Sequence, residues 1–241
     1  MRLLLTNDDG YLAVGLAVLG VALLKAGHDV CVIAPRREYS GAGTSLGQVR
    51  YGAEVDVARQ RIDELGDAPV FAVDGPPGLA VKLALSGHLA APPEVVVSGI
   101  NRGWNTGAAA IHSGTLGAAI TACANGVSAL AVSCGKDSDV GCDTAGRVAS
   151  ELVPRLASAP EPVALNVNVP SLPFDRLSGW RTVPLDRVGL HDVRVDYAGG
   201  VLRYALQANH DHMTPDCDSA AVRDGFVAVT ALSGRYESAA Y

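Results

Sequence analysis

Short, fully apolar segments alternate with longer segments of helical character through most of the chain. The apolar segments predict strands over 2–6, 29–34, 94–98, 128–133 and 163–167. The segments between them predict helices over 12–26, 114–125 and 144–157. Strands that alternate with helices are joined by right-handed crossovers, which leave the strands parallel and cover both faces of the sheet. The pattern therefore predicts an α/β fold with a Rossmann-like three-layer core and a mainly parallel sheet.

Two regions depart from this alternation. Residues 47–73 begin with apolar side chains at every second position, which predicts a hairpin or another β excursion from the core. After Pro170, short segments are separated by turn residues, and apolar and polar residues alternate over 202–207 as in antiparallel strands. We therefore predict a core over 1–181 and a β-rich arm over 182–241, which packs on the core or reaches a neighbouring subunit.

The bulk composition changes this picture little but limits the partners. The 241 residues, 49% of them hydrophobic, suffice for one main domain. The formal net charge of -6 and the pI near 5.4 argue against a surface for polymeric nucleic acid, which is normally basic. A small phosphorylated ligand stays open, because a bound metal can reverse the sign of the local field.

Cysteine usage and hydropathy indicate the compartment. Of the five cysteines, Cys31 and Cys123 lie in apolar segments, where reduced thiols are typical, so we expect a reducing environment. Residues 11–24 are the most apolar stretch near the start, but they are shorter than a membrane span and have no basic leader or cleavage site. We expect a buried helix there and a cytoplasmic protein without membrane attachment.

Two adjacent carboxylates, Asp8 and Asp9, follow the first predicted strand directly. The carboxyl ends of parallel strands are where α/β sheets build their binding sites. Neighbouring carboxylates repel each other in a partly desolvated pocket unless a cation lies between them, and hard oxygen ligands select Mg²⁺ or Mn²⁺. The alternative is a solvated turn in which one of the two acids caps the next helix.

Three further loops offer oxygen atoms and amides. Residues 34–45 are rich in glycine and hydroxyl groups, which suits close approach to a phosphate, although an ordinary surface loop reads similarly. Residues 98–107 hold two asparagines that could offer oxygens to a cation or form an Asx turn. Residues 113–115 open a helix whose free amides favour an anion, with N-capping by Ser113 as the alternative. If these loops converge with the acid pair, they form a site for a metal and a phosphate.

Competing motifs are weaker. A phosphoaspartyl mechanism with Asp8 as nucleophile normally needs a second acid two residues later, where this chain has Gly10. The His- and Asp-rich tract over 209–212 has no partner cluster and is expected to be an exposed loop. Cys134 and Cys142 lack a Cys-x-x-Cys spacing, so we expect both to be structural.

Five stretches carry a more specific signal. They read Leu-Thr-Asn-Asp-Asp-Gly over 5–10, Ala-Pro followed by Ser-Gly over 34–41, Val-Ser-Gly-Ile-Asn-Arg-Gly over 97–103, Ser-Gly-Thr-Leu-Gly-Ala-Ala over 113–119 and Leu-Asn-Val-Asn-Val-Pro over 165–170. In this combination the chain resembles the SurE family, the survival-protein E metal-dependent nucleotidases. A weaker similarity extends over 218–230, so the resemblance covers nearly the whole chain.

The resemblance implies a phosphomonoesterase that releases phosphate from nucleoside monophosphates, 5′ and also 3′, with one divalent cation, Mg²⁺ or Mn²⁺, in each subunit. The implied metal ligands are Asp8, Asp9, Ser40 and Asn101. The implied phosphate and substrate positions are Asn7, Gly41, Asn105, Ser113, Gly114 and Thr115. The resemblance further implies that the C-terminal arm is exchanged between subunits, which would give a homodimer or a tetramer, with 218–229 in the interface.

These residues suggest a division of work. The cation would orient a water for in-line attack, with Asp8 or Asp9 accepting its proton. Ser113 and Thr115 would hold phosphoryl oxygens. His112, beside the phosphate turn, either protonates the leaving oxygen or is structural.

The chain also departs from the family pattern. Arg36 stands where an acid is common, and 108–110 are alanines where acids are frequent. All implied metal ligands are retained, so these changes bear on substrate choice. They also leave open a second hypothesis, a regulatory protein that binds a metal and a phosphate ligand without turnover.

Overall fold

The computed structural model describes residues 1–136, 138–188, 190–208 and 214–234. Its main sheet has nine strands in the order β3-β4-β2-β1-β5-β6-β7-β11-β8. The strands are β1 (Arg2–Thr6), β2 (Asp29–Pro35), β3 (Val57–Gln60), β4 (Val70–Val73), β5 (Val95–Arg102), β6 (Ala129–Cys134), β7 (Ala164–Val169), β8 (Trp180–Thr182) and β11 (Val227–Leu232). From β4 through β2, β1, β5 and β6 to β7, each strand runs parallel to the next one in the sheet, which confirms the predicted α/β class.

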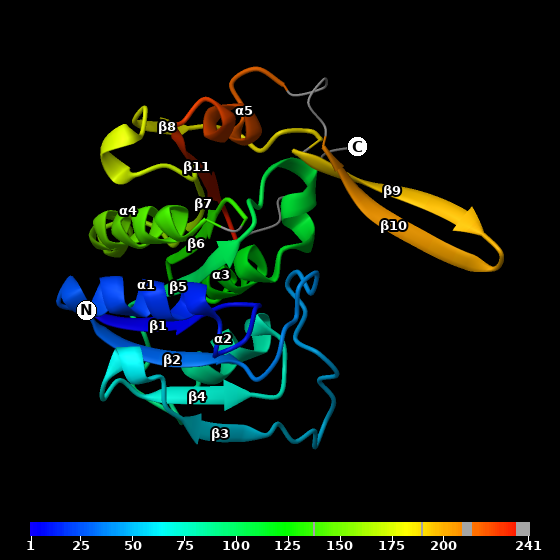
Figure 1. Ribbon diagram of the computed structural model, residues 1–241. Helices are drawn as coiled ribbons and strands as arrows, with labels where there is room; N and C mark the ends of the chain where they lie inside the picture. Colours follow the sequence, from blue (N-terminus) through cyan, green and yellow to red (C-terminus); the bar gives the residue numbers. More distant parts are fainter. Residues whose placement is uncertain (137, 189, 209–213, 235–241) are drawn as a thin grey trace, which may run out of the picture.

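Helices cover both faces of this sheet (Figure 1). On one face α1 (Val14–Lys25) packs beside α4 (Asp139–Ala157), and on the other α2 (Pro77–Leu85) packs beside α3 (Gly114–Ala124). The side chains of β1 show why: Leu3 and Leu5 join the core on the α1 face, and Leu4 joins the core on the α3 face. A strand buried on both sides reads as an unbroken apolar run, as this one does. None of the described helices is long and apolar enough to cross a membrane.

The β excursion is shorter than the alternating pattern indicated. Residues 49–56 form no strand, and the pairing begins at Val57, where β3 runs antiparallel to β4. The predicted hairpin is therefore confirmed only for its second half. The sequence pattern did not predict α2, which begins at Pro77 and has Pro76 as its N-cap. Proline suits the first helical position because its missing N–H would have no partner there.

The part of the chain that stands apart from the core is smaller than the expected arm over 182–241. It consists of the hairpin β9 (His191–Ala198) and β10 (Val201–Ala208), which extends away from the body (Figure 1). The chain then returns to the core, where β11 pairs antiparallel with β7 and parallel with β8. In this protomer, residues 218–232 thus complete its own sheet. The tract over 209–212 lies outside the described residues.

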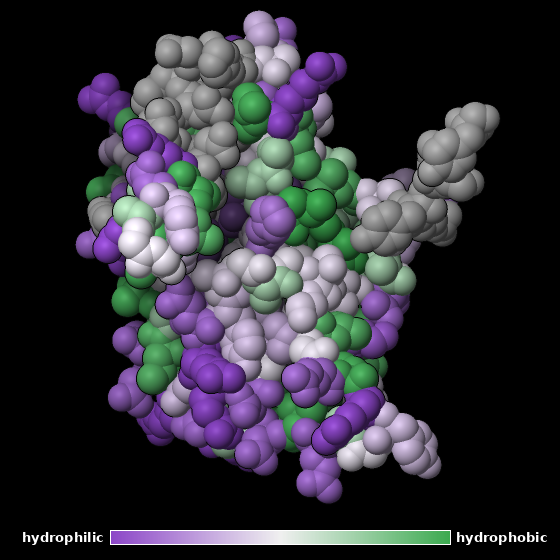
Figure 2. Space-filling view, turned by 90° about the vertical axis from the view of Figure 1, so that its right-hand side faces the viewer, coloured by the Kyte–Doolittle hydropathy of each residue, from purple (hydrophilic) through white to green (hydrophobic). Residues whose placement is uncertain are grey.

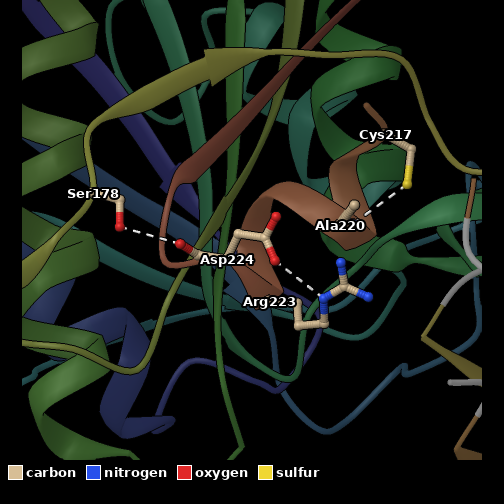
Figure 3. A network of polar contacts seen from close by, with 5 residues as sticks. All are labelled: Ser178, Cys217, Ala220, Arg223 and Asp224. Atoms are coloured by element: carbon tan, nitrogen blue, oxygen red, sulfur yellow. Dashed lines mark hydrogen bonds and ion pairs between the residues drawn. The ribbon is translucent and has the colours of Figure 1, made fainter. Parts of the chain in front are cut away.

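The return to the core is fixed by the short helix α5 (Asp218–Arg223) (Figure 3). Its N-cap is Cys217, whose sulfur accepts a hydrogen bond from the Ala220 amide at 3.4 Å. At its other end, the Ser178 hydroxyl donates to the Asp224 carbonyl at 3.1 Å. The helix is thereby tied to the loop that precedes β8.

Candidate active site

The four loops singled out in the sequence lie at one edge of the sheet. Leu5 of β1 is aligned with Val32 of β2 and with Val97 of β5, so the loops that follow these three strands leave the sheet together. Figure 2 looks onto this edge and shows a hollow near the middle of the face. The register thus brings the acid pair and the loops after β2 and β5 to one place.

Asp8 is held rigidly in this edge. Its side chain is buried, and its Oδ1 accepts a hydrogen bond from the Thr115 hydroxyl at 2.5 Å. Its backbone carbonyl accepts from the Tyr39 amide at 2.7 Å, which joins the first loop to the second. Gly114 leaves room for the carboxylate, since a Cβ there would lie 2.8 Å from Asp8 Oδ2. Burial raises the pKa of Asp8 despite these bonds.

Asp9 is half-buried and surrounded by other charges. Burial, and after it the negative charges of Asp8 and Glu38, raise its pKa to about 6, although the positive charge of Arg102 acts in the opposite direction. Neither acid caps the next helix, because α1 begins at Val14 and its N-cap, Ala13, makes no side-chain bond. The helix-cap alternative for this pair is therefore wrong.

Ser40 and Gly41 are exposed in the loop that follows β2. The Ser40 hydroxyl donates a hydrogen bond to Glu38 Oε1 at 2.8 Å, which leaves the oxygen lone pairs of Ser40 available to a ligand. Gly41 has a φ of +83°, a conformation that suits glycine. The sequence analysis missed Glu38, a third carboxylate at the site, although its position two residues before Ser40 could have signalled it.

Asn101 lies near the end of β5, where the register with β6 shifts between Gly99 and Asn101. Such a shift turns side chains away from the regular pleat. The Asn101 amide nitrogen donates to the Gly103 carbonyl at 2.6 Å, so its carbonyl oxygen Oδ1 is the atom left for a ligand. The Arg102 guanidinium forms an ion pair with Asp139 at 3.4 Å.

Asn105 belongs to a polar network below the site. Its amide nitrogen Nδ2 donates to the Ser133 hydroxyl at 2.9 Å, and its backbone N–H donates to Asn168 Oδ1 at 2.8 Å. Its backbone carbonyl accepts from the side chains of Asn166 and Asn168. These bonds fix the loop after β5, so the structure shows Asn105 as a scaffold residue.

The α3 N-terminus faces Asp8. Ser113 is its N-cap and accepts a hydrogen bond from the Leu116 amide at 3.1 Å, as the capping alternative predicted. That bond uses a lone pair, so the hydroxyl hydrogen can still bind an anion. The Thr115 hydroxyl, in contrast, donates its hydrogen to Asp8 Oδ1. His112 is exposed, and its backbone carbonyl accepts from the Gly43 amide at 3.1 Å.

Asn7 is fully buried beneath the acid pair, and its amide nitrogen donates to the Gly10 carbonyl at 2.9 Å. Within the described part of the chain, Asn7 Oδ1, Thr6 Oγ1 and Ser98 Oγ are buried without a hydrogen-bond partner. Thr6 and Ser98 are aligned neighbours in β1 and β5. Buried polar atoms normally find partners, so this side of the site is polar enough for water or a ligand.

The residues present fit a hard cation. Two carboxylates, an amide oxygen and a hydroxyl are all oxygen donors, which Mg²⁺ and Mn²⁺ prefer. Burial raises the pKa of both acids, and a cation bound between them would favour their charged forms. No cluster of three or more His, Cys, Asp or Glu side chains suited to a metal occurs among the described residues, so a soft or imidazole-rich site is not present there.

A separate hollow of about 840 Å³ is lined by residues of α1, of α4 and of the segment 61–64. Its lining is largely apolar and includes Leu12, Val14 and Val18. None of the implied metal or phosphate residues lines it. The candidate site is therefore defined by its convergent polar groups and not by this hollow.

Residues 3–191 match the family model described as survival protein SurE. The chain belongs to the SurE family. Two curated proteins, each named 5′-nucleotidase SurE, are similar to this chain over 96% of its length. The one from Synechococcus elongatus is 35% identical, and the match covers 93% of that protein. The one from Stenotrophomonas maltophilia is 36% identical, and the match covers 89% of it. The crystal structure of the SurE protein from Aquifex aeolicus superposes with a TM-score of 0.82 at 28% identity, covering 98% of this chain and 95% of that one.

Proposed function

We propose that this SurE-family chain is a metal-dependent 5′-nucleotidase, which hydrolyses nucleoside 5′-monophosphates, and 3′-monophosphates as well, to nucleoside and phosphate. The observation that carries the proposal is the contact between the acid pair and the start of α3. Through the Thr115–Asp8 hydrogen bond, oxygen donors for a cation and amides for an anion lie side by side. A phosphomonoester bound to a cation needs both.

Asp8, Asp9, Ser40 and Asn101 are the residues that would hold the cation. When bound, it would neutralise phosphoryl charge and make an adjacent water more acidic. Thr115 fixes the orientation of Asp8. Asp9, half-exposed and with a pKa near 6, is the better placed of the two acids to take a proton from water.

The start of α3 would bind the phosphoryl oxygens. The Ser113 hydroxyl presents a donor, and the helix dipole favours negative charge there, where the amides of Gly114 and Thr115 already donate to the Asp8 carboxylate. Gly41 leaves the facing loop open, since a Cβ at that position would meet nothing within 4 Å. Asn7 and Asn105 support the two turns from below. We assign His112 no step.

A substrate panel tests this proposal. Phosphate release is measured with 5′- and 3′-nucleoside monophosphates and with a phosphomonoester that has no base, each in Mn²⁺, in Mg²⁺ and in a chelator. We expect metal-dependent release, fastest from the 5′-nucleotides. Binding of Mn²⁺ and nucleotide without release would instead establish the regulatory alternative, to which the alanines at 108–110 point.

We further propose that the chain works as a cytoplasmic homodimer or tetramer, with 1–181 as its catalytic core and 182–241 contributing the contacts between subunits. The β9–β10 hairpin supports this, because its side chains Val195, Tyr197, Leu202 and Tyr204 are exposed. Extended apolar edges are normally covered. The net charge of -6 supports a small-molecule substrate over polymeric nucleic acid.

A further inference from the structure

Two buried cysteines, which the sequence analysis expected to be merely structural, touch each other. Cys134 ends β6 and Cys142 lies in the first turns of α4, and their sulfurs are 3.2 Å apart. Both are free thiols, with exposed fractions of 0% and 2%. The two cysteines are eight residues apart in the sequence, so a search for the Cys-x-x-Cys spacing does not find them.

The surroundings favour one thiol as the reactive member. Cys142 lies close to the N-terminus of a long helix, where the positive end of the dipole stabilises a thiolate. The hydrogen bond with Cys134 lowers the pKa of the Cys142 thiol. The Arg102 guanidinium acts in the same direction, whereas burial and the carboxylates of Asp139 and Asp143 act against it. Arg102 is aligned with Cys134 across β5 and β6 and pairs with Asp139, three residues before Cys142.

We propose that Cys134 and Cys142 form a reversible redox site that closes into a disulfide when hydrogen peroxide reaches it. In the first step the Cys142 sulfur attacks one peroxide oxygen, the O–O bond breaks, and a sulfenic acid and one water form. In the second, the Cys134 sulfur attacks the Cys142 sulfur, the S–O bond breaks, and a second water leaves with the Cys134 proton. Both sulfurs are oxidised, and the peroxide is reduced to two waters.

The near-complete burial of the pair selects the oxidant. A bulky disulfide reagent must enter the first turn of α4, whereas hydrogen peroxide is close to water in size. The neighbours Asp139 and Val140 are exposed, so the path to Cys142 is short. The other described thiols make no such contact: the Cys123 sulfur, for instance, donates to the Pro162 carbonyl.

Trypsin separates the two cysteines, which makes the test direct. Cleavage after Arg102, Lys136 and Arg147 gives peptides 103–136 and 137–147, which contain Cys134 and Cys142 respectively. After treatment of the folded, full-length protein with hydrogen peroxide, we expect a linked pair of these peptides on a non-reducing map. We also expect the loss of two of five titratable thiols, and the recovery of both after dithiothreitol.

Three variants make the result specific. Cys134→Ser and Cys142→Ser should each abolish the linked pair, and Cys134→Ser excludes Cys123, which lies in the same peptide. Cys31→Ser is the matched control and should leave the pair intact. Absence of the linked pair in folded wild-type protein, or oxidation of Cys142 to sulfinic acid without a link, would overturn the proposal.

Discussion

The two aspartates at the end of β1 are neighbours in sequence but differ in their surroundings. Asp8 is buried and bonded to Thr115, whereas Asp9 is half-exposed and faces Glu38 and Arg102. The orientation of one carboxylate is therefore fixed, and the other is partly open to solvent. This difference gives the site a measurable dependence on pH.

The first prediction concerns the stability of the metal-free protein. The pKa of Asp9 is about 6 in the folded chain against an ordinary 3.8, so the folded state binds the extra proton between these values. The free energy of unfolding must then fall as the pH rises from about 4 to 6 and stay lower above that. Chemical denaturation of Asp9→Asn at pH 7 should show a gain of about 1 to 2 kcal/mol over wild type, allowing for partial exposure.

Near pH 4, wild type and Asp9→Asn should have similar free energies of unfolding, because Asp9 is then protonated in the folded wild type. Adding Mn²⁺ at pH 7 should reverse the order, since the cation stabilises the wild-type pair. Parallel pH profiles for wild type and Asp9→Asn would show that Asp9 does not carry the raised pKa.

The second prediction concerns Thr115, whose hydroxyl the structure places on Asp8 and not free for phosphate. Removing a hydrogen bond to a charged group costs roughly 1.5 to 3 kcal/mol, so Thr115→Val should weaken Mn²⁺ binding by about 10-fold or more. Thr115→Ser keeps the hydroxyl and should bind nearly as wild type. Calorimetric titration of both variants with Mn²⁺ tests this prediction. An unchanged Mn²⁺ affinity in Thr115→Val would refute the role of Thr115 in orienting Asp8.

At this scale the sequence revealed which residue types gather at the site but not their bonds. Because Asp8 and Asp9 directly follow an apolar strand, their position at the sheet edge could be predicted from the sequence. The Thr115 hydroxyl joins a residue 107 positions away, and no local pattern encodes that choice. The network around Asn105 was hidden for the same reason.

At the scale of elements, the helices and strands with strong periodicity were predictable, and those set by distant pairing were not. The five apolar strands of the parallel core and the helices α1, α3 and α4 lie where the pattern placed them, within a few residues. α2 was hidden by the Gly-Pro-Pro-Gly turn signal at its start. β11 was assigned to the arm because its partner β7 lies about 60 residues earlier.

The third prediction concerns how closely α3 packs against the loop after β2. A Cβ at Gly117 would lie 1.9 Å from the Gly43 carbonyl oxygen, so Gly117→Ala must displace backbone. We expect a loss of about 1 to 3 kcal/mol in the free energy of unfolding. Gly146→Ala in α4 is the matched control, because the nearest contact there is a methyl group at 3.1 Å. Equal free energies of unfolding for the two variants would mean that the loop after β2 can shift at little cost.

For the whole molecule, the body is complete without the β9–β10 hairpin, which pairs only with itself among the described strands. Its apolar side chains Val195, Tyr197, Leu202 and Tyr204 are exposed. The fourth prediction is that replacing 191–208 with a short Gly-Ser linker lowers the oligomeric order and leaves the core folded. Light scattering and circular dichroism measure the two effects. A full-length protein that is monomeric at micromolar concentration would contradict the subunit contact.

The central claim is that Asp8 and Asp9 hold a divalent cation at which nucleotide phosphate is released. Mn²⁺ binding and phosphate release from a nucleoside 5′-monophosphate should therefore be measured on the same samples of wild type, Asp8→Asn and Asp9→Asn. The exposed Asp63→Asn serves as the control. We predict that both site variants stay folded, bind Mn²⁺ more weakly and lose on the order of 10²-fold or more in rate, while the control matches wild type. Near-normal turnover in both site variants would contradict the account.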